Sequence, residues 1–367
     1  MNRRSTLRLL RVASRELDRA MTQMRIPGQP RPFYIAYLVR DEEYFRVQAK
    51  YGSVIQRADE RRRNAFVDVR VGSYRADQVR EGGLSDNDKE AESYNYVELP
   101  FGDNADALAH GLWRLTDARY REAVESSLDK QSRALTYLDP GRHLPSFERR
   151  APRVRVDWRD FPAVDRDRWT EYVERTSRSI RRYDGVVDSF VEFEADHGCR
   201  VFVNSEGSRL VECTPIWSVE CYLWLFAADG HAFPWNIKHT VTDPDELPDE
   251  QALMLEIRRA VATLHRLAGA PTIRSFCGPA LLEPIPAGLL IHEAVGHRLE
   301  GNRLLSTGEG QTFKDSLGQT ILPPFLTIRD DPRLARWDGH SLVGHYAFDD
   351  EGVEAQSAEL VERGRLT

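Results

Sequence analysis

The sequence predicts an α+β fold of two domains, with antiparallel sheets, packed helices and a metal-binding helix in the C-terminal domain. Alternating apolar residues with short connections, as over 33–57, indicate antiparallel strands. Runs with helical periodicity flank these strands, and a chain of 367 residues is long enough for two cores. Pro244 and Pro248 interrupt the pattern. We therefore expect an N-terminal α+β domain over 1–244 and a C-terminal metal-site domain over 245–367.

The N-terminal domain is expected to hold two groups of strands that are separated by helices. The first group follows an opening helix over 6–24, and the second follows helices over 103–134 and 166–182. An acidic turn at 41–43 and Gly52 divide the first group. The expected strands are 33–40, 44–51, 54–57 and 66–71 in the first group, and 187–193, 199–203, 209–214 and 221–227 in the second.

The C-terminal domain is expected to begin with an amphipathic helix over 249–268. Asp249 is a suitable N-cap, Leu253 and Ile257 begin an apolar stripe, and Gly269 ends the helix. The segment 277–283 has the pattern of a strand and leads into the helix that carries the histidines.

Composition and charge exclude several classes of protein. The net charge of −7 and the isoelectric point near 5.9 argue against a nucleic-acid partner, which needs concentrated positive charge. No apolar run approaches the roughly 20 residues of a membrane span. The segment Met1 to Met24 contains arginines but no continuous apolar core, so it resembles an amphipathic helix rather than a secretory signal. We expect a cytoplasmic protein.

The four cysteines are expected to be reduced. Cys199, Cys213, Cys221 and Cys277 include no C-x-x-C pair, and a disulfide framework is not expected without a secretory signal. Each is interpreted as a small buried apolar residue.

The chemistry of the chain is concentrated at His292, Glu293 and His297, which follow an apolar run. Neutral imidazoles bind zinc, and an adjacent glutamate can act as a general base. The two histidines are five residues apart, so on a regular helix their side chains point about 140° apart. They can share one metal only if the helix widens or ends between them, and Gly296 makes such a break inexpensive. The alternative is a helix with one buried and one exposed histidine.

The flanking residues favour the metal. Gly278-Pro279 and the stretch 288–302 resemble the H-E-x-x-x-H signature of the TldD/PmbA family, in its TldD-like branch. Further similar segments are Asp330-Asp331-Pro332, Asp349-Asp350-Glu351-Gly352 and Asn204-Ser205-Glu206-Gly207. The stretch departs from the family at Asn302, where an acidic residue is usual.

The resemblance implies a zinc-dependent metallopeptidase. His292 and His297 would bind zinc and Glu293 would be the general base. Glu300 would orient His297, or be a solvated surface carboxylate; the sequence favours neither. The resemblance places Asp349 and Asp350 on the substrate side, although a solvated acidic turn or a hard-cation site would also explain them.

The resemblance also implies a third zinc ligand, a cysteine that the family supplies near its C-terminus. No cysteine follows Cys277, and the chain ends at Thr367. We therefore expect a C-terminal domain that is shortened or has lost part of its site. His340 and His345 could substitute, but their surroundings are typical of polar turns.

Three functions remain open from the sequence. The first is a zinc peptidase that cleaves peptides or unfolded segments, as a homodimer or paired with a PmbA-like subunit, as the resemblance implies. The second is a catalytically inactive scaffold or regulatory subunit. The third is a metal-binding protein that does not hydrolyse peptides.

Overall fold

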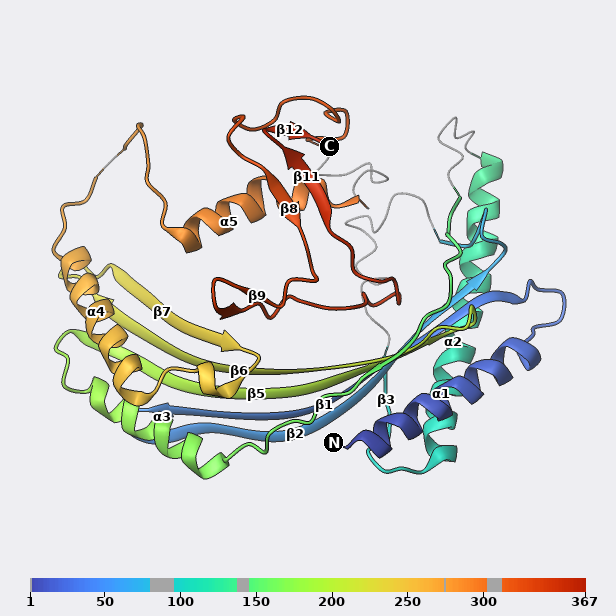
Figure 1. Ribbon diagram of the computed structural model, residues 1–367, viewed down its shortest axis with the longest axis horizontal. Coiled ribbons are helices and arrows are strands. Elements are labelled where there is room, and N and C mark those ends of the chain that lie inside the picture. The colour runs from blue at the N-terminus through green and yellow to red at the C-terminus, as the bar shows by residue number, and fades with distance from the viewer. Residues whose placement is uncertain (1, 80–95, 137–144, 274, 302–311) are drawn as a thin grey trace.

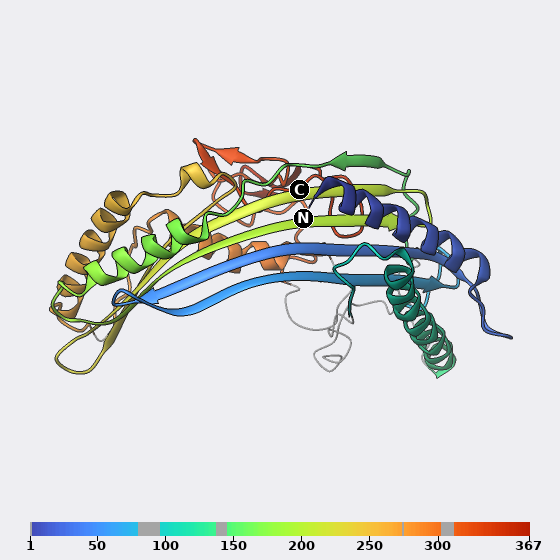
Figure 2. The same ribbon diagram turned by 90° about the horizontal axis from the view of Figure 1, so that it is seen from below.

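The computed structural model describes residues 2–79, 96–136, 145–273, 275–301 and 312–367. Its main feature is one long, curved sheet (Figure 1). Helices cover the convex face of this sheet. The C-terminal segment, residues 277–301 and 312–367, lies on the concave side (Figures 1 and 2). The mixture of helices with a mainly antiparallel sheet confirms the predicted α+β class.

The large sheet has seven strands in the order β3-β2-β1-β5-β6-β4, with β7 also paired to β6. Every pairing is antiparallel except β4 with β6. The two expected groups of strands therefore form a single sheet, joined where β1 pairs with β5. The strands are β1 Pro32–Lys50, β2 Ser53–Val71, β3 Val97–Glu98, β4 Val154–Asp157, β5 Val186–Asn204, β6 Arg209–Phe226 and β7 Ala232–Val241.

The prediction of short strands is wrong, because each pair of expected segments forms one long, continuous strand. The segments 33–40 and 44–51 both belong to β1, and the other expected pairs of segments merge in the same way within β2, β5 and β6. The acidic residues at 41–43 stay in the strand because the chain supplies partners for them there. Fully buried Asp41 accepts hydrogen bonds from Arg63, at 2.7 Å, and from Arg61. A buried carboxylate is tolerated when it is paired in this way.

Two hydrophobic cores lie between the sheet and its helices. Side chains alternate along each strand, and odd-numbered residues such as Val39 and Val47 face the helices. Helices α1 (Arg3–Gln23) and α2 (Ala105–Thr136) cover one half of the sheet, and α3 (Arg166–Ile180) and α4 (Glu250–Ala268) cover the other. The even-numbered side chains point to the concave face, where Arg46 pairs with Glu192 and Lys50 with Asp188.

Helix α4 matches its prediction and packs on the large sheet. The Asp249 side chain accepts a hydrogen bond from the Ala252 amide, and Gly269 is the C-cap. Leu253, Ile257 and Val261 are buried in the core that α3 and the sheet share. This helix thus completes a core of the N-terminal sheet, while the expected division at residue 244 stays a prediction.

Cys199 and Cys213 form a disulfide, which corrects the expectation of four reduced thiols. They are directly opposite each other on β5 and β6, with Cα atoms 4.1 Å apart. Fourteen residues separate them in sequence, so only the strand register reveals the pairing. Cys221 is a buried free thiol, as expected, whereas Cys277 is free and exposed. Because disulfides are uncommon in reducing compartments, the cytoplasmic location stays a prediction.

The C-terminal segment consists of short elements around small sheets. Residues 277–283, expected to be a strand, have no regular structure. Strands β8, β11 and β12 form one small sheet, and β9 pairs with β10. Among the described helices, none is long and apolar enough to span a membrane. The elements are η1 Pro244–Glu246, α5 Pro284–Ala294, η2 Gly296–Leu299, β8 Ile328–Asp330, β9 Arg336–Trp337, β10 His340–Ser341, β11 Ala358–Glu362 and β12 Arg365–Leu366.

Candidate metal centre

The end of α5 brings His292, Glu293 and His297 together. Their potential ligand atoms all lie within 4.8 Å of one another, and the two imidazole centroids are 4.5 Å apart. Helix α5 ends at Ala294, and a 3-10 turn begins at Gly296. The helix thus ends between the two histidines, which is one of the two geometries that their spacing requires for a shared metal.

The break has a simple local cause. Val295 leaves the helical conformation, with φ −122° and ψ −52°, and its side chain is only 3% exposed. With this valine buried, the chain turns after α5, and the turn places the imidazole of His297 beside that of His292. The side chains of His292 and Glu293 stay about 60% exposed. A metal and a substrate could therefore both reach the group from solvent.

Glu293 and Glu300 have different relations to the imidazoles. The Oε1 atom of Glu293 is 3.9 Å from Nε2 of His292, and its Oε2 atom is 4.0 Å from Nε2 of His297. Those gaps are too long for hydrogen bonds. Glu300, in contrast, accepts a 2.6 Å hydrogen bond from Nδ1 of His297. This contact leaves Nε2 of His297 free to bind a metal, which is how carboxylates orient metal-binding histidines.

The two imidazoles suit zinc, and the carboxylate of Glu293 can either bind the ion or act as a base beside it. Catalytic zinc sites use three protein ligands, so with Glu293 as the base this group lacks one. Over the described ranges, these three residues are the one group of three or more potential ligands. His340 lies on β10 and His345 lies in a loop after it, and neither belongs to the group. Asn302 lies outside the described residues.

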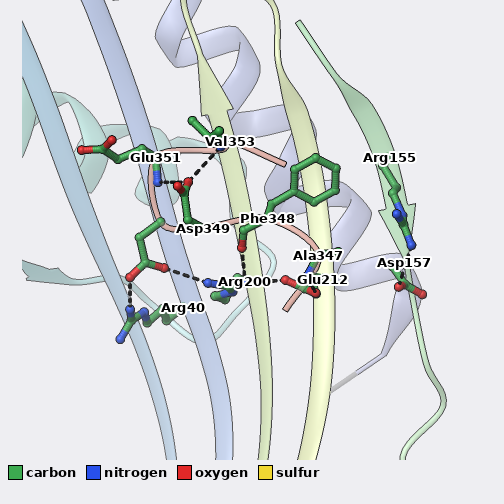
Figure 3. Close-up of polar contacts among 11 residues, drawn as sticks. Arg40, Arg155, Asp157, Arg200, Glu212, Ala347, Phe348, Asp349, Glu351 and Val353 are labelled. Carbon is green, nitrogen blue, oxygen red and sulfur yellow. Dashed lines mark hydrogen bonds and ion pairs between the residues drawn. The ribbon is translucent and has the colours of Figure 1, made fainter. Parts of the chain in front are cut away.

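Asp349 lies in a turn over the large sheet (Figure 3), and Asp350 is the next residue of that turn. Asp349 accepts hydrogen bonds from the amides of Glu351 and Val353, at 2.9 and 2.8 Å. Asp350 pairs with Arg40 at 2.7 Å and with Arg200 at 2.8 Å. Both residues therefore have partners within the chain, and a substrate-side role for them stays a prediction.

Sequence reasoning did not find the partners of Asp350. Arg40 and Arg200 are 310 and 150 residues before it, so no local spacing links them. The only signal is the alternation of charged with apolar residues along the strands, which places both arginines on the face opposite the helices.

Comparison with known proteins finds metallopeptidase relatives. Residues 277–367 match the family profile of the PmbA/TldA metallopeptidase C-terminal domain. A metalloprotease of Synechocystis sp. is 30% identical over 185 residues, which cover 50% of this chain and 38% of that protein. A metalloprotease of Methanothermobacter thermautotrophicus is 27% identical over 86% of this chain and 66% of its own length. A metalloprotease TldD homologue of Haemophilus influenzae is 32% identical over 30% of this chain and 20% of its length.

Solved structures share the fold. A Bacteroides thetaiotaomicron protein that carries the name modulator of DNA gyrase aligns with a TM-score of 0.62 and 12% identity, over 97% of this chain and 70% of that one. TldE from Thermococcus kodakarensis aligns with a TM-score of 0.54 and 13% identity, over 99% of this chain and 68% of that one. The chain thus spans less than two thirds of the three curated relatives. Residues 277–367 therefore match the C-terminal domain of the PmbA/TldD family, and the whole described chain shares the fold of that family's solved structures.

Proposed function

We propose that the protein is a zinc-dependent metallopeptidase that hydrolyses peptides or unfolded polypeptide segments. The observation that carries this proposal is the grouping of His292, Glu293 and His297 within 4.8 Å. When bound, zinc would lower the pKa of a water ligand far below that of free water, to roughly 7, and would polarise a carbonyl group. His292 and His297 would hold the metal, and Glu300 would keep the Nδ1 proton of His297 in place.

Glu293 would act as the general base. It lies next to both imidazoles without a hydrogen bond to either, so its carboxylate is available to a water between them. It would take the proton of the attacking water and pass it to the amine that leaves when the peptide bond breaks.

We predict that Glu293→Gln abolishes hydrolysis while zinc binding persists. The amide cannot accept a proton, so kcat/KM should fall at least about 100-fold on an unfolded polypeptide. Glu283→Gln, at the other end of α5, is the matched control, because that side chain makes no capping hydrogen bond. Survival of activity in Glu293→Gln would refute the assigned role, and equal loss in both variants would indicate damage to the helix instead.

The alternative is a catalytically inactive scaffold or regulatory subunit. It is favoured by the number of ligands: with Glu293 as the base, this group supplies only His292 and His297, one fewer than the three protein ligands of catalytic zinc sites. If wild-type protein binds zinc but cleaves no peptide, with or without a partner subunit, this alternative replaces the enzyme.

We infer further that the protein works as a homodimer or in a pair with a PmbA-like subunit. Helix α5 is apolar except for His292 and Glu293 in its last turn, yet none of its residues is buried. A helix of this kind is normally covered. Leu281, just before α5, and Ile285, in its first turn, are 98% and 87% exposed. An exposed apolar surface of this kind is suitable for contact with another subunit.

The pairing is tested by sedimentation of wild-type protein and of Ile285→Lys. We expect the wild type to sediment as a dimer, alone or with its partner, and Ile285→Lys to dissociate. Ile55→Lys, at an exposed position on β2, should leave the assembly intact. A wild-type monomer under all these conditions would contradict the inference.

A further inference from the structure

The large sheet carries a charged row to which the C-terminal segment is fastened. Strand register places Arg40 of β1 opposite Arg200 of β5, and Arg200 opposite Glu212 of β6. All three side chains point to the concave face. Arg200 and Glu212 are ion-paired, so the sheet itself holds this pair. Arg40 and Arg200 are like charges on neighbouring strands, an arrangement that is destabilising unless an anion lies between them.

The anion is Asp350. Its two carboxylate oxygens accept from different arginines, Oδ2 from Arg40 at 2.7 Å and Oδ1 from Arg200 at 2.8 Å. Arg200 also donates to the carbonyl oxygen of Phe348 at 2.6 Å, and Glu212 accepts from the Ala347 amide at 2.7 Å. Figure 3 shows Arg200 between Glu212 and the 347–353 turn. Both members of the Arg200–Glu212 pair are thus hydrogen-bonded to residues of the turn.

Apolar contacts reinforce the charged ones. Phe348 is 6% exposed and packs in a small core with Tyr34, Phe202 and Leu210 of the sheet. Gly352, with φ +77°, lies so close to Phe202 that a Cβ atom would be 2.3 Å from the ring. The turn therefore fits the large sheet closely. The Tyr346 amide ties it to the carbonyl oxygen of Pro332, just after β8, and the Ala355 amide closes it by donating to the carbonyl oxygen of Ala347.

We propose that Arg200 and Asp350 are positioning residues, which fasten the C-terminal segment to the large sheet and so hold the metal centre over its concave face. The turn and the metal centre lie in the same matched domain, residues 277–367. Helix α5 lies on the concave side of the large sheet (Figure 1). This inference rests on the proposed function, because it includes the proposal that a long peptide lies along the concave face of the sheet during cleavage.

The fastening is tested by hydrogen exchange of the intact chain. In Asp350→Ala, the amides of Ala347 and Gly352 should exchange about three to ten times faster, because a bridging carboxylate is lost and two arginines repel. Asp350→Glu keeps the carboxylate and should restore slow exchange. Glu359→Ala, which removes an exposed pair with Arg329 inside the small sheet, is the control and should change neither amide. Unchanged exchange in Asp350→Ala would overturn the proposal.

A second readout separates positioning from general stability. Zinc content should be the same in all three variants. Asp350→Ala should raise KM about tenfold for an unfolded polypeptide that spans the sheet and leave kcat/KM for a short peptide unchanged, and Asp350→Glu should recover the low KM. Equal loss on both substrates would reject the positioning role. If the wild type cleaves neither substrate, the proposed function fails, whereas the exchange result still decides whether the fastening exists.

Discussion

At the scale of single residues, the candidate site depends on which hydrogen-bond or ion-pair partner each charged side chain has. Glu300 could be read as an orienting or a surface carboxylate; its 2.6 Å contact with Nδ1 of His297 fits the orienting role, which stays a prediction. The proximity of His292, Glu293 and His297 could be predicted because one short stretch contains them, whereas their role as a metal site stays a prediction. The partners of Asp350 could not be predicted, since they come from strands that only the folded sheet brings alongside.

A buried histidine outside the metal centre makes stability depend on pH. His197 is 5% exposed and lies between Phe161 and Trp217, with ring centroids 4.8 and 4.9 Å away. Burial lowers its pKa from 6.5 to about 4. The folded state therefore favours the neutral imidazole. The stability it supports is present above pH 6.5 and is lost as the pH falls toward 4.

We predict that His197→Phe removes this dependence. For the wild type, titration of His197 should lower the free energy of unfolding by about 3 kcal/mol between pH 7 and pH 4. Phenylalanine does not titrate and fits among the aromatic rings, so its curve should be flatter by that amount. Denaturant unfolding at pH 7, 5.5 and 4 provides the measurement. Parallel curves for the two proteins would show that His197 does not titrate on unfolding.

At the scale of elements, long-range pairing overrides local signals. The sequence indicates a break at 41–43, yet β1 runs through it because Arg63 and Arg61 neutralise Asp41. Helix α4 was predictable, since an N-cap, a periodic apolar stripe and a C-terminal glycine are local features. For α5 the histidine spacing predicted that the helix widens or ends between them, and the structure shows that it ends. The disulfide and the single sheet were not, because both depend on the register of β5 with its neighbours.

The fit of the 347–353 turn on the sheet predicts a difference between two glycines. Gly352 and Gly339 both have positive φ, +77° and +80°, but only Gly352 faces Phe202; Gly339 has open space around its Cα. Alanine at either position strains the backbone by about 1 kcal/mol. Gly352→Ala also forces a clash, so it should lower the free energy of unfolding by a further 1–3 kcal/mol, roughly. Equal effects in thermal unfolding would contradict the close contact.

At the scale of the whole molecule, a curved sheet supports a small C-terminal segment that carries the metal residues. The fold class followed from alternation and helical periodicity, which are properties of the sequence itself. The attachment of the segment to the concave face did not, because it uses a row of charges across β1, β5 and β6. The function proposed for this molecule requires that His292 of α5 and His297 of η2 bind a metal.

The most direct test is zinc per chain, measured by elemental analysis of the purified protein beside His292→Ala. His340→Ala is the matched control, because His340 lies on β10 and outside the metal group. We predict about one zinc per chain in the wild type and in His340→Ala, and a loss of zinc in His292→Ala. Absence of zinc from all three proteins, or its retention in His292→Ala, would contradict the assignment of the metal centre.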